Sequence, residues 1–273
     1  MTTSYVHGYS SDESRRLRDQ ADTLADLLHY DTRFPEGDAV LECGCGNGSQ
    51  TVHLAGANPG VRFTCIDIAA SSLNTARSRI ADAGLTNVRF LKADLFEPPF
   101  ETRTFEHLFF CFVLEHLTDP IAALKAAGRL LKPGGTVTVI EGDHGSWYCH
   151  PASAAAQRNV DCLVKVQAAA GGDALIGRRL YPLLTAAGFR QVRVSPRLVY
   201  VDASRPEWVQ GFSKKTFIAM VAGVRQQALA QGLTDEAAWN RGMHDLNRAT
   251  EADGTFCYTF FKATAMGAHK AQS

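Results

Sequence analysis

Short apolar runs alternate with longer amphipathic stretches along the first half of the chain. Each run holds β-branched or aromatic residues between turn formers, which is typical of strands buried on both faces of a sheet. Strands are predicted over 38–42, 62–67, 88–92, 107–112 and 136–141, with helices over 50–57, 70–83 and 120–130 between them. This alternation predicts an α/β fold with a doubly wound, seven-stranded, mostly parallel, Rossmann-like sheet once the later strands are added.

The pattern changes after residue 141. Residues 191–201 are predicted to form a sixth strand, interrupted at Pro196, and residues 255–262 a seventh. Between these strands apolar residues recur every three or four positions, over a length too great for a simple connection. We therefore expect a helical cap over 203–254, inserted between strands six and seven. Leucines at helical spacing also predict an amphipathic helix before the first strand, within residues 1–35.

Composition and charge argue against several classes of protein. The 273 residues include 28 basic and 28 acidic side chains, so the net charge is zero and neither nucleic acid nor an anionic membrane is an expected partner. The seven cysteines are odd in number and form no C-x-x-C pair, so neither a disulfide framework nor a metal site is predicted. The polar N-terminus and the lack of a long apolar run predict a cytoplasmic protein.

Three glycines at alternate positions follow the first predicted strand. Gly44, Gly46 and Gly48 lie between this strand and the next helix, where a ligand can approach the backbone because there is no Cβ. Asp67 and Asp94 end the second and third strands, at the carboxyl edge where doubly wound sheets bind nucleotides. Alone, the loop could be a plain tight turn, and either carboxylate could be a helix cap or a solvated strand end.

These motifs together resemble those of the class I S-adenosylmethionine-dependent methyltransferases, of the UbiE/Coq5-like small-molecule type. The resemblance rests on E-x-G-C-G-x-G at 42–48, Asp67, A-D at 93–94, F-x-L-E-H-L at 112–117 and L-K-P-G-G at 131–135. It covers residues 38–141 and implies transfer of a methyl group from S-adenosylmethionine to a small organic acceptor, with S-adenosylhomocysteine as product. The acceptor atom (oxygen, nitrogen or carbon) and the oligomeric state are left open.

The resemblance also implies an organisation and a set of cofactor-binding residues. The chain is expected to be a single methyltransferase domain over 1–273, with an N-terminal helical lid over 1–35 and a cofactor-binding core over 36–142. Glu42 would approach the methionine amino group, Asp67 the ribose and Asp94 the adenine. The residues expected to contact the cofactor are Glu42, Gly44, Cys45, Gly46, Gly48, Gln50, Asp67, Ile68, Ala93, Asp94, Leu95 and Phe112.

Two other functions are compatible with a glycine-rich loop of this kind. A nicotinamide-dependent oxidoreductase places its third glycine three residues after the second, whereas Gly46 and Gly48 are two apart. A non-catalytic nucleoside-binding protein of the same fold would keep every donor-side motif. Binding of S-adenosylmethionine against NAD separates the first alternative, and turnover separates the second.

The residues that assist methyl transfer are harder to predict. His144 is the leading candidate for a general base, in a segment (141–148) predicted to be a polar loop after the fifth strand. Glu141 and Asp143 are expected to orient His144 or to bind a polar acceptor. Tyr9, in an N-terminal segment that would fold over the cofactor, is the third catalytic candidate. His144 could instead be an ordinary hydrogen-bonded loop residue, and Tyr9 an aromatic contact for the first helix.

Overall fold

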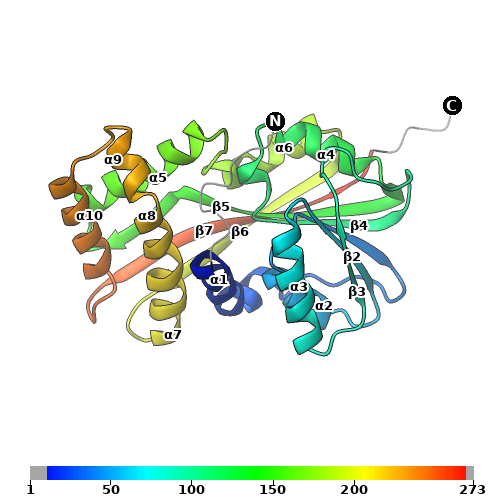
Figure 1. The fold of residues 1–273 in the computed structure, drawn as a ribbon, viewed down its shortest axis with the longest axis horizontal. Helices are drawn as coiled ribbons and strands as arrows, with labels where there is room; N and C mark the ends of the chain where they lie inside the picture. Colours follow the sequence, from blue (N-terminus) through cyan, green and yellow to red (C-terminus); the bar gives the residue numbers. More distant parts are fainter. Residues whose placement is uncertain (1–10, 269–273) are drawn as a thin grey trace.

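The fold is a seven-stranded sheet with helices on both faces and a helical cap at one end (Figure 1). The structure, a computed structural model, describes residues 11–268. The strand order is β3-β2-β1-β4-β5-β7-β6, and β7 is antiparallel to both of its neighbours while the other pairs are parallel. The predicted fold class is therefore confirmed. The strands are β1 (Ala39–Cys43), β2 (Arg62–Asp67), β3 (Val88–Lys92), β4 (Phe105–Cys111), β5 (Leu131–His150), β6 (Arg190–Val201) and β7 (Thr255–Met266).

The helices form two layers and the cap. We call the side of the sheet covered by α1 and α2 the α1 face, and the side covered by α4 and α6 the α4 face (Figure 1). The helices are α1 (Ser11–His29), α2 (Ser49–Gly56), α3 (Ala70–Asp82), α4 (Pro120–Gly128), α5 (Ala154–Ala169), α6 (Leu180–Ala186), α7 (Pro206–Trp208), α8 (Ala219–Gly223), α9 (Arg225–Ala230) and α10 (Glu236–Arg248). Two 3₁₀ turns, η1 (Leu114–His116) and η2 (Ile176–Arg179), and a π-helix, η3 (Val209–Ile218), complete them.

A separate hydrophobic core lies against each face of the sheet. In β4, Phe109 and Cys111 pack in the core on the α1 face, whereas Leu108 and Phe110 pack in the core on the α4 face. This alternation follows from the two-residue period of a strand and explains why residues 108–111 of β4 are an unbroken apolar run. Both faces of the central strands are therefore buried.

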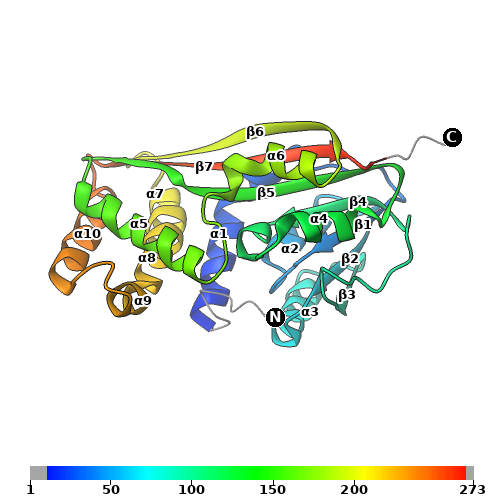
Figure 2. The ribbon, with the colours of Figure 1, turned by 90° about the horizontal axis from the view of Figure 1, so that it is seen from above.

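Strands β5, β6 and β7 extend beyond the other strands toward the cap (Figure 2). β5 does not end at Glu141, as predicted, but continues through the segment taken for a polar loop to His150, paired with β7 across a bulge. Nor is β6 interrupted at Pro196, because β6 is an edge strand, where the missing N–H need not pair. Helices α7–α10 and η3 lie between β6 and β7 in the chain, and α5, which was not predicted, packs on α10.

The end of α1 is tied to β6 and β7 by buried cations. Lys262 Nζ donates to Asp31 Oδ1 and to Thr32 Oγ1, each at 2.6 Å. Arg197 pairs with the other oxygen of Asp31 and lies over the ring of Tyr30, 4.6 Å from its centroid. Both cationic side chains are less than a tenth exposed. This cluster fixes α1 between the cap and the central strands, the position it occupies in Figure 1.

Candidate functional site

The glycine loop joins β1 to α2 and has two kinds of glycine. Gly44, Gly46 and Gly48 all have positive φ angles of 73°, 52° and 74°, which side chains other than glycine rarely adopt. A Cβ on Gly44 would lie 2.8 Å from Val113, and one on Gly48 would lie 2.9 Å from Ala76. A Cβ on Gly46 would meet no atom within 4 Å. The outer glycines therefore allow close packing, while Gly46 leaves open space above the loop.

Two carboxylates lie beside the glycine loop. Glu42 is buried at the end of β1, and its Oε2 accepts hydrogen bonds from Thr51 Oγ1 at 2.8 Å and Cys65 Sγ at 3.2 Å. Burial raises the pKa of Glu42 to about 7. Asp67, at the end of β2, accepts a bond from the Gly46 N–H on Oδ2, at 2.8 Å, and burial raises its pKa as well.

The ends of β2 and β3 form a surface suited to a nucleoside. Asp67 Oδ1 accepts the Ala69 N–H at 2.8 Å, so each oxygen of Asp67 keeps a lone pair for a further donor such as a ribose hydroxyl. Ile68 beside it is 52 % exposed, an unusual apolar exposure next to a buried strand. Asp94 is exposed beyond β3, and its Oδ1 accepts the Phe96 N–H at 2.8 Å. The open Gly46, the apolar Ile68 and these carboxylates fit an adenosyl group.

Other residues expected near the cofactor have local partners. Gln50 Oε1 lies 2.8 Å from His29 Nε2 of α1, which joins α1 to the helix after the glycine loop. Burial lowers the pKa of His29 to about 4, so its imidazole is neutral. Cys45 is buried in the loop, the Ala93 N–H donates to the Asp67 carbonyl oxygen at 3.1 Å, and Leu95 is half-buried beside Asp94.

Phe112 connects this surface to a pocket. It follows β4 with a φ of 57°, a left-handed conformation that is uncommon outside glycine and is often found at functional sites. Its ring lies 5.3 Å from that of Phe260 on β7. Phe112 thus stands between the glycine loop, which is packed against Val113, and the aromatic side chains of β7.

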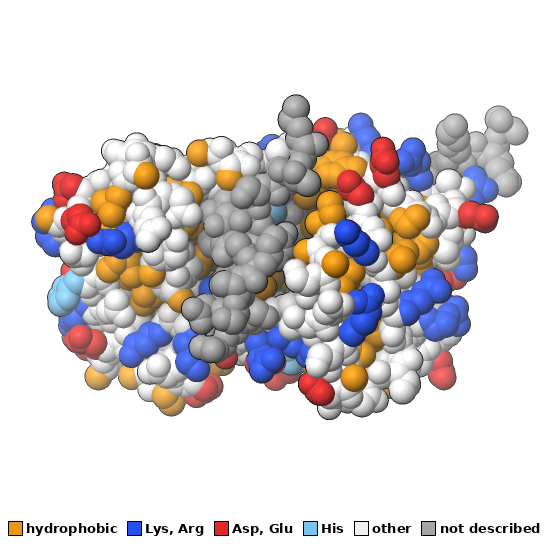
Figure 3. Space-filling model, viewed as in Figure 1, with side chains coloured by type: hydrophobic (Ala, Val, Ile, Leu, Met, Phe, Trp, Pro, Cys, Tyr) orange, Lys and Arg blue, Asp and Glu red, His pale blue; other side chains and the backbone are white. Residues whose placement is uncertain are grey.

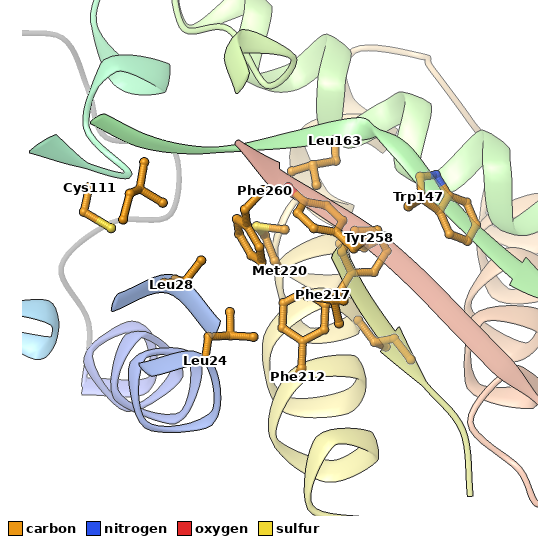
Figure 4. Packing of buried hydrophobic residues seen from close by; sticks show 14 of the residues in the cluster. Leu24, Leu28, Cys111, Trp147, Leu163, Phe212, Phe217, Met220, Tyr258 and Phe260 are labelled. Carbon is orange, nitrogen blue, oxygen red and sulfur yellow. The ribbon is translucent and has the colours of Figure 1, made fainter. Parts of the chain in front are cut away.

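The pocket lies on the α1 face, between α1, η3 and β7, with a cavity volume of about 50 Å³. Figure 4 shows Phe212 and Phe217 pointing from η3 toward Tyr258 and Phe260 of β7. Its apolar walls are Leu17, Phe112, Phe212, Phe217, Met220 and Phe260. The polar side chains that border it are Arg16, Gln20, Glu115, His116, His144, Thr216 and Tyr258. The pocket therefore combines apolar walls with a similar number of polar side chains.

His144 contributes one nitrogen to this pocket. It is buried in β5, its Nδ1 lies 2.7 Å from Tyr258 Oη, and its ring meets that of Phe217 edge to face. Its Nε2 is buried and has no hydrogen-bond partner among residues 11–268. Burial lowers the pKa of His144 below its usual value, so the imidazole is neutral at neutral pH. A neutral imidazole facing a pocket can accept a proton there.

Glu141 and Asp143 do not orient His144. Side chains alternate along a strand, and these two point to the α4 face while His144 points to the α1 face. Glu141 Oε1 accepts the N–H groups of Val113 at 3.0 Å and Leu114 at 2.7 Å, and burial raises its pKa well above the usual range. Asp143 binds Arg178 of η2 through both oxygens. These carboxylates anchor η1 and η2 to β5.

Sequence reasoning missed Tyr258 and the role of η3. Tyr258 is separated from His144 by 114 residues and reads as one of several aromatics in an apolar strand. The aromatic residues 212, 217 and 260 are buried and also border the pocket. A single tyrosine among the aromatic residues of this strand was the available signal. Tyr9 lies outside the described residues.

The surface adds little to this site. On the face shown in Figure 3, Lys and Arg side chains lie in several separate groups. Arg178 and Arg179 pair with Asp143 and Asp173. None of the helices within residues 11–268 is both long and apolar enough to span a bilayer.

Comparisons with known proteins find matches that include the glycine loop. Residues 40–135 match a family described as "Methyltransferase domain". The chain is 28 % identical to the 27-O-demethylrifamycin SV methyltransferase of Amycolatopsis mediterranei, over 82 % of this chain and 76 % of that protein. It is 34 % identical to the demethylmenaquinone methyltransferase of Staphylococcus aureus, over 39 % of this chain and 44 % of that protein.

Solved structures share the fold. Phosphoethanolamine N-methyltransferase 2 of Haemonchus contortus, in complex with phosphomonomethylethanolamine and S-adenosylhomocysteine, superposes with a TM-score of 0.59. The match covers 95 % of this chain and 58 % of that one, at 15 % sequence identity. At this identity the likeness concerns the arrangement of strands and helices, including those on either side of the glycine loop.

Proposed function

We propose that this chain, which belongs to the class I S-adenosylmethionine-dependent methyltransferases, methylates a small organic molecule in the pocket between α1, η3 and β7. The observation that carries the proposal is the continuity of the site. Phe112 follows β4, the strand beside the one that leads into the glycine loop. It also borders the pocket that holds His144. A donor on the loop and an acceptor in the pocket would then be neighbours.

The residues of the donor side have separable roles. The glycine loop leaves space at Gly46, Asp67 presents acceptors for the ribose hydroxyls, and Ile68 offers an apolar surface to the adenine. Glu42 would reach the methionine amino group from beneath the loop. When bound, S-adenosylmethionine supplies a methyl group on a positively charged sulfur. A largely closed pocket favours this transfer because charge is dispersed as the methyl group moves.

The acceptor side indicates the class of acceptor. Aromatic and aliphatic walls favour an acceptor with an apolar part, and the polar side chains beside them favour one that also carries polar groups. A buried neutral imidazole favours a nucleophilic atom that must lose a proton. The two relatives have rifamycin and menaquinone precursors in their names, which are organic small molecules of this general kind.

Calorimetric titration is the first test. S-adenosylhomocysteine should bind the purified full chain, and NAD should not. Asp67→Ala should abolish the heat of binding, while Asp202→Ala, which removes a half-buried aspartate beyond β6, should not change it. A folded protein that takes up no S-adenosylhomocysteine would overturn the proposal. Turnover of S-adenosylmethionine with candidate acceptors, followed by mass spectrometry of the methylated product, then tests the acceptor class.

A further inference from the structure

Tyr258 occupies a fixed position beside His144. Its ring centroid lies 4.8 Å from that of Phe260 and 5.7 Å from those of Phe212 and Phe217, so aromatic side chains of β7 and η3 hold it. A Cβ on Gly142 would lie 2.4 Å from Tyr258 Oη, so the hydroxyl fills the space that glycine leaves on β5. Neither the ring nor the hydroxyl can move far without displacing a neighbour.

Tyr258 and His144 both border the pocket, and the hydroxyl of Tyr258 lies against one nitrogen of the imidazole. Tyr258 Oη lies 2.7 Å from His144 Nδ1, and His144 Nε2 is the buried nitrogen without a partner in the described part of the chain. The partner of one ring nitrogen determines which nitrogen carries the proton and which way the ring faces. A structural tyrosine needs only some hydrogen-bond partner, whereas this one is placed where it sets the chemistry of Nε2.

We propose that Tyr258 is a positioning residue: its Oη accepts the Nδ1–H of His144 and so presents the lone pair of Nε2 to the acceptor. The inference rests on the proposed function for its chemical purpose. As the bond between the acceptor atom and the methyl carbon forms, the carbon–sulfur bond breaks with its electron pair on sulfur. The acceptor's proton passes to His144 Nε2. The resulting imidazolium donates from Nδ1 to the neutral phenol of Tyr258.

The charged and titratable groups around the pair are few. Arg16 of α1, Glu115 and His116 of η1 and Asp143 of β5 act on the imidazole electrostatically. Burial raises the pKa of Tyr258 well above its usual value, so it remains a phenol throughout the working range. The hydroxyl therefore acts as a hydrogen-bond partner, and the proton from the acceptor stays on His144 until it returns to solvent.

Nitrogen-15 NMR of the ligand-free full chain, labelled at histidine, tests the tautomer directly. His144 signals are assigned by their loss in His144→Gln. In the wild type, Nδ1 should be protonated and Nε2 should not. Tyr258→Phe keeps the ring and should shift His144 toward the Nε2–H tautomer. Gly142→Ala, which displaces the hydroxyl without removing it, should do the same. Tyr200→Phe, at an exposed position of β6, should change nothing.

Two results would overturn the proposal. One is a wild-type His144 protonated at Nε2, and the other is an unchanged tautomer in both Tyr258→Phe and Gly142→Ala. Because the measurement needs no ligand, it is independent of the titration with S-adenosylhomocysteine that tests the proposed function. With the acceptor that the wild type methylates, Tyr258→Phe should lower kcat by roughly tenfold to a hundredfold. KM should change little, and the rising limb of the kcat/KM pH profile should move to lower pH.

Discussion

The donor side and the acceptor side of the site are built in different ways. The donor side uses backbone and strand ends between Glu42 and Asp94, with neighbouring parallel strands bringing short sequence motifs together. The acceptor side uses side chains from α1, η1, β5, η3 and β7, spread from Arg16 to Phe260. A binding surface made of backbone leaves a contiguous signature in the sequence, whereas a pocket made of distant side chains does not. The two sides should therefore respond to mutation independently.

The largest effect should come from the acceptor side. His144→Ala removes the proton acceptor and should lower kcat by roughly 10²–10⁴-fold. The affinity for S-adenosylhomocysteine, measured by calorimetry, should stay within about twofold because His144 lies outside the glycine loop. His244→Ala, an exposed histidine on α10, is the matched control. A full loss of donor binding in His144→Ala would show that the two sides are coupled.

The next effect concerns the cluster that ties the end of α1 to β6 and β7. Asp31→Ala leaves Lys262 and Arg197 as buried cations without their carboxylate and should lower the free energy of unfolding by about 3 kcal/mol. Burial opposes ionisation of Asp31, but hydrogen bonds from Lys262 and Arg197 lower its pKa overall. Its stabilising contribution is thus present above the unfolded pKa and lost as pH falls toward the folded one. Urea denaturation at several pH values measures the loss of stability and its dependence on pH. Equal stability of wild type and variant at neutral pH would contradict the stabilising role of Asp31.

A pair of glycine substitutions separates packing from binding on the donor side. Gly46→Ala strains a left-handed residue in open space, so it should weaken S-adenosylhomocysteine binding by at least about tenfold, or ~1.4 kcal/mol, with a small loss of stability. Gly48→Ala adds contact with Ala76 to the same strain and should lower Tm clearly more. Comparing calorimetry with thermal denaturation distinguishes them. Equal loss of Tm in both variants would contradict the difference between the two glycines.

The smallest effect is on the pH dependence of donor binding. Glu42 has a pKa of about 7, so above pH 7 it is ionised and attracts the methionine ammonium group. The affinity for S-adenosylhomocysteine should rise by roughly threefold to tenfold between pH 6 and 8. In the ligand-free protein the sign is opposite: the raised folded pKa means that stability falls as pH rises through about 7. Glu42→Gln should flatten both dependences, and a slope that survives in Glu42→Gln would implicate another group.

The sequence predicted the central strands and the donor-side motifs because both are local signals. The predicted bounds of β2 and β3 are the observed ones, because each strand is a short apolar run between turn formers. The roles of the individual donor-side residues remain predictions. Pro196 misled because its effect depends on whether a strand is central or at an edge, and only the sheet order decides that.

The acceptor side could not be predicted because β5 lacks the sequence pattern of a strand after residue 141. Residues 141–150 hold polar and small side chains on both faces: Asp143 pairs with Arg178 while His144 pairs with Tyr258. Each of these two side chains has a hydrogen-bond partner far along the chain, and the segment has no alternation of apolar and polar positions to mark it as a strand. This segment is a strand because it pairs with β7, and the local sequence pattern does not reveal that pairing.

β7 follows the cap in the chain but lies between β5 and β6 in the sheet. During synthesis β1 to β4 have their neighbours within about seventy residues, whereas β5 and β6 cannot be joined until residues as far as 266 have left the ribosome. The nascent chain thus holds a glycine loop before it holds a pocket. Until β7 is inserted, the edges of β5 and β6 that pair with it are exposed. These edges are the parts of the nascent chain most in need of a chaperone.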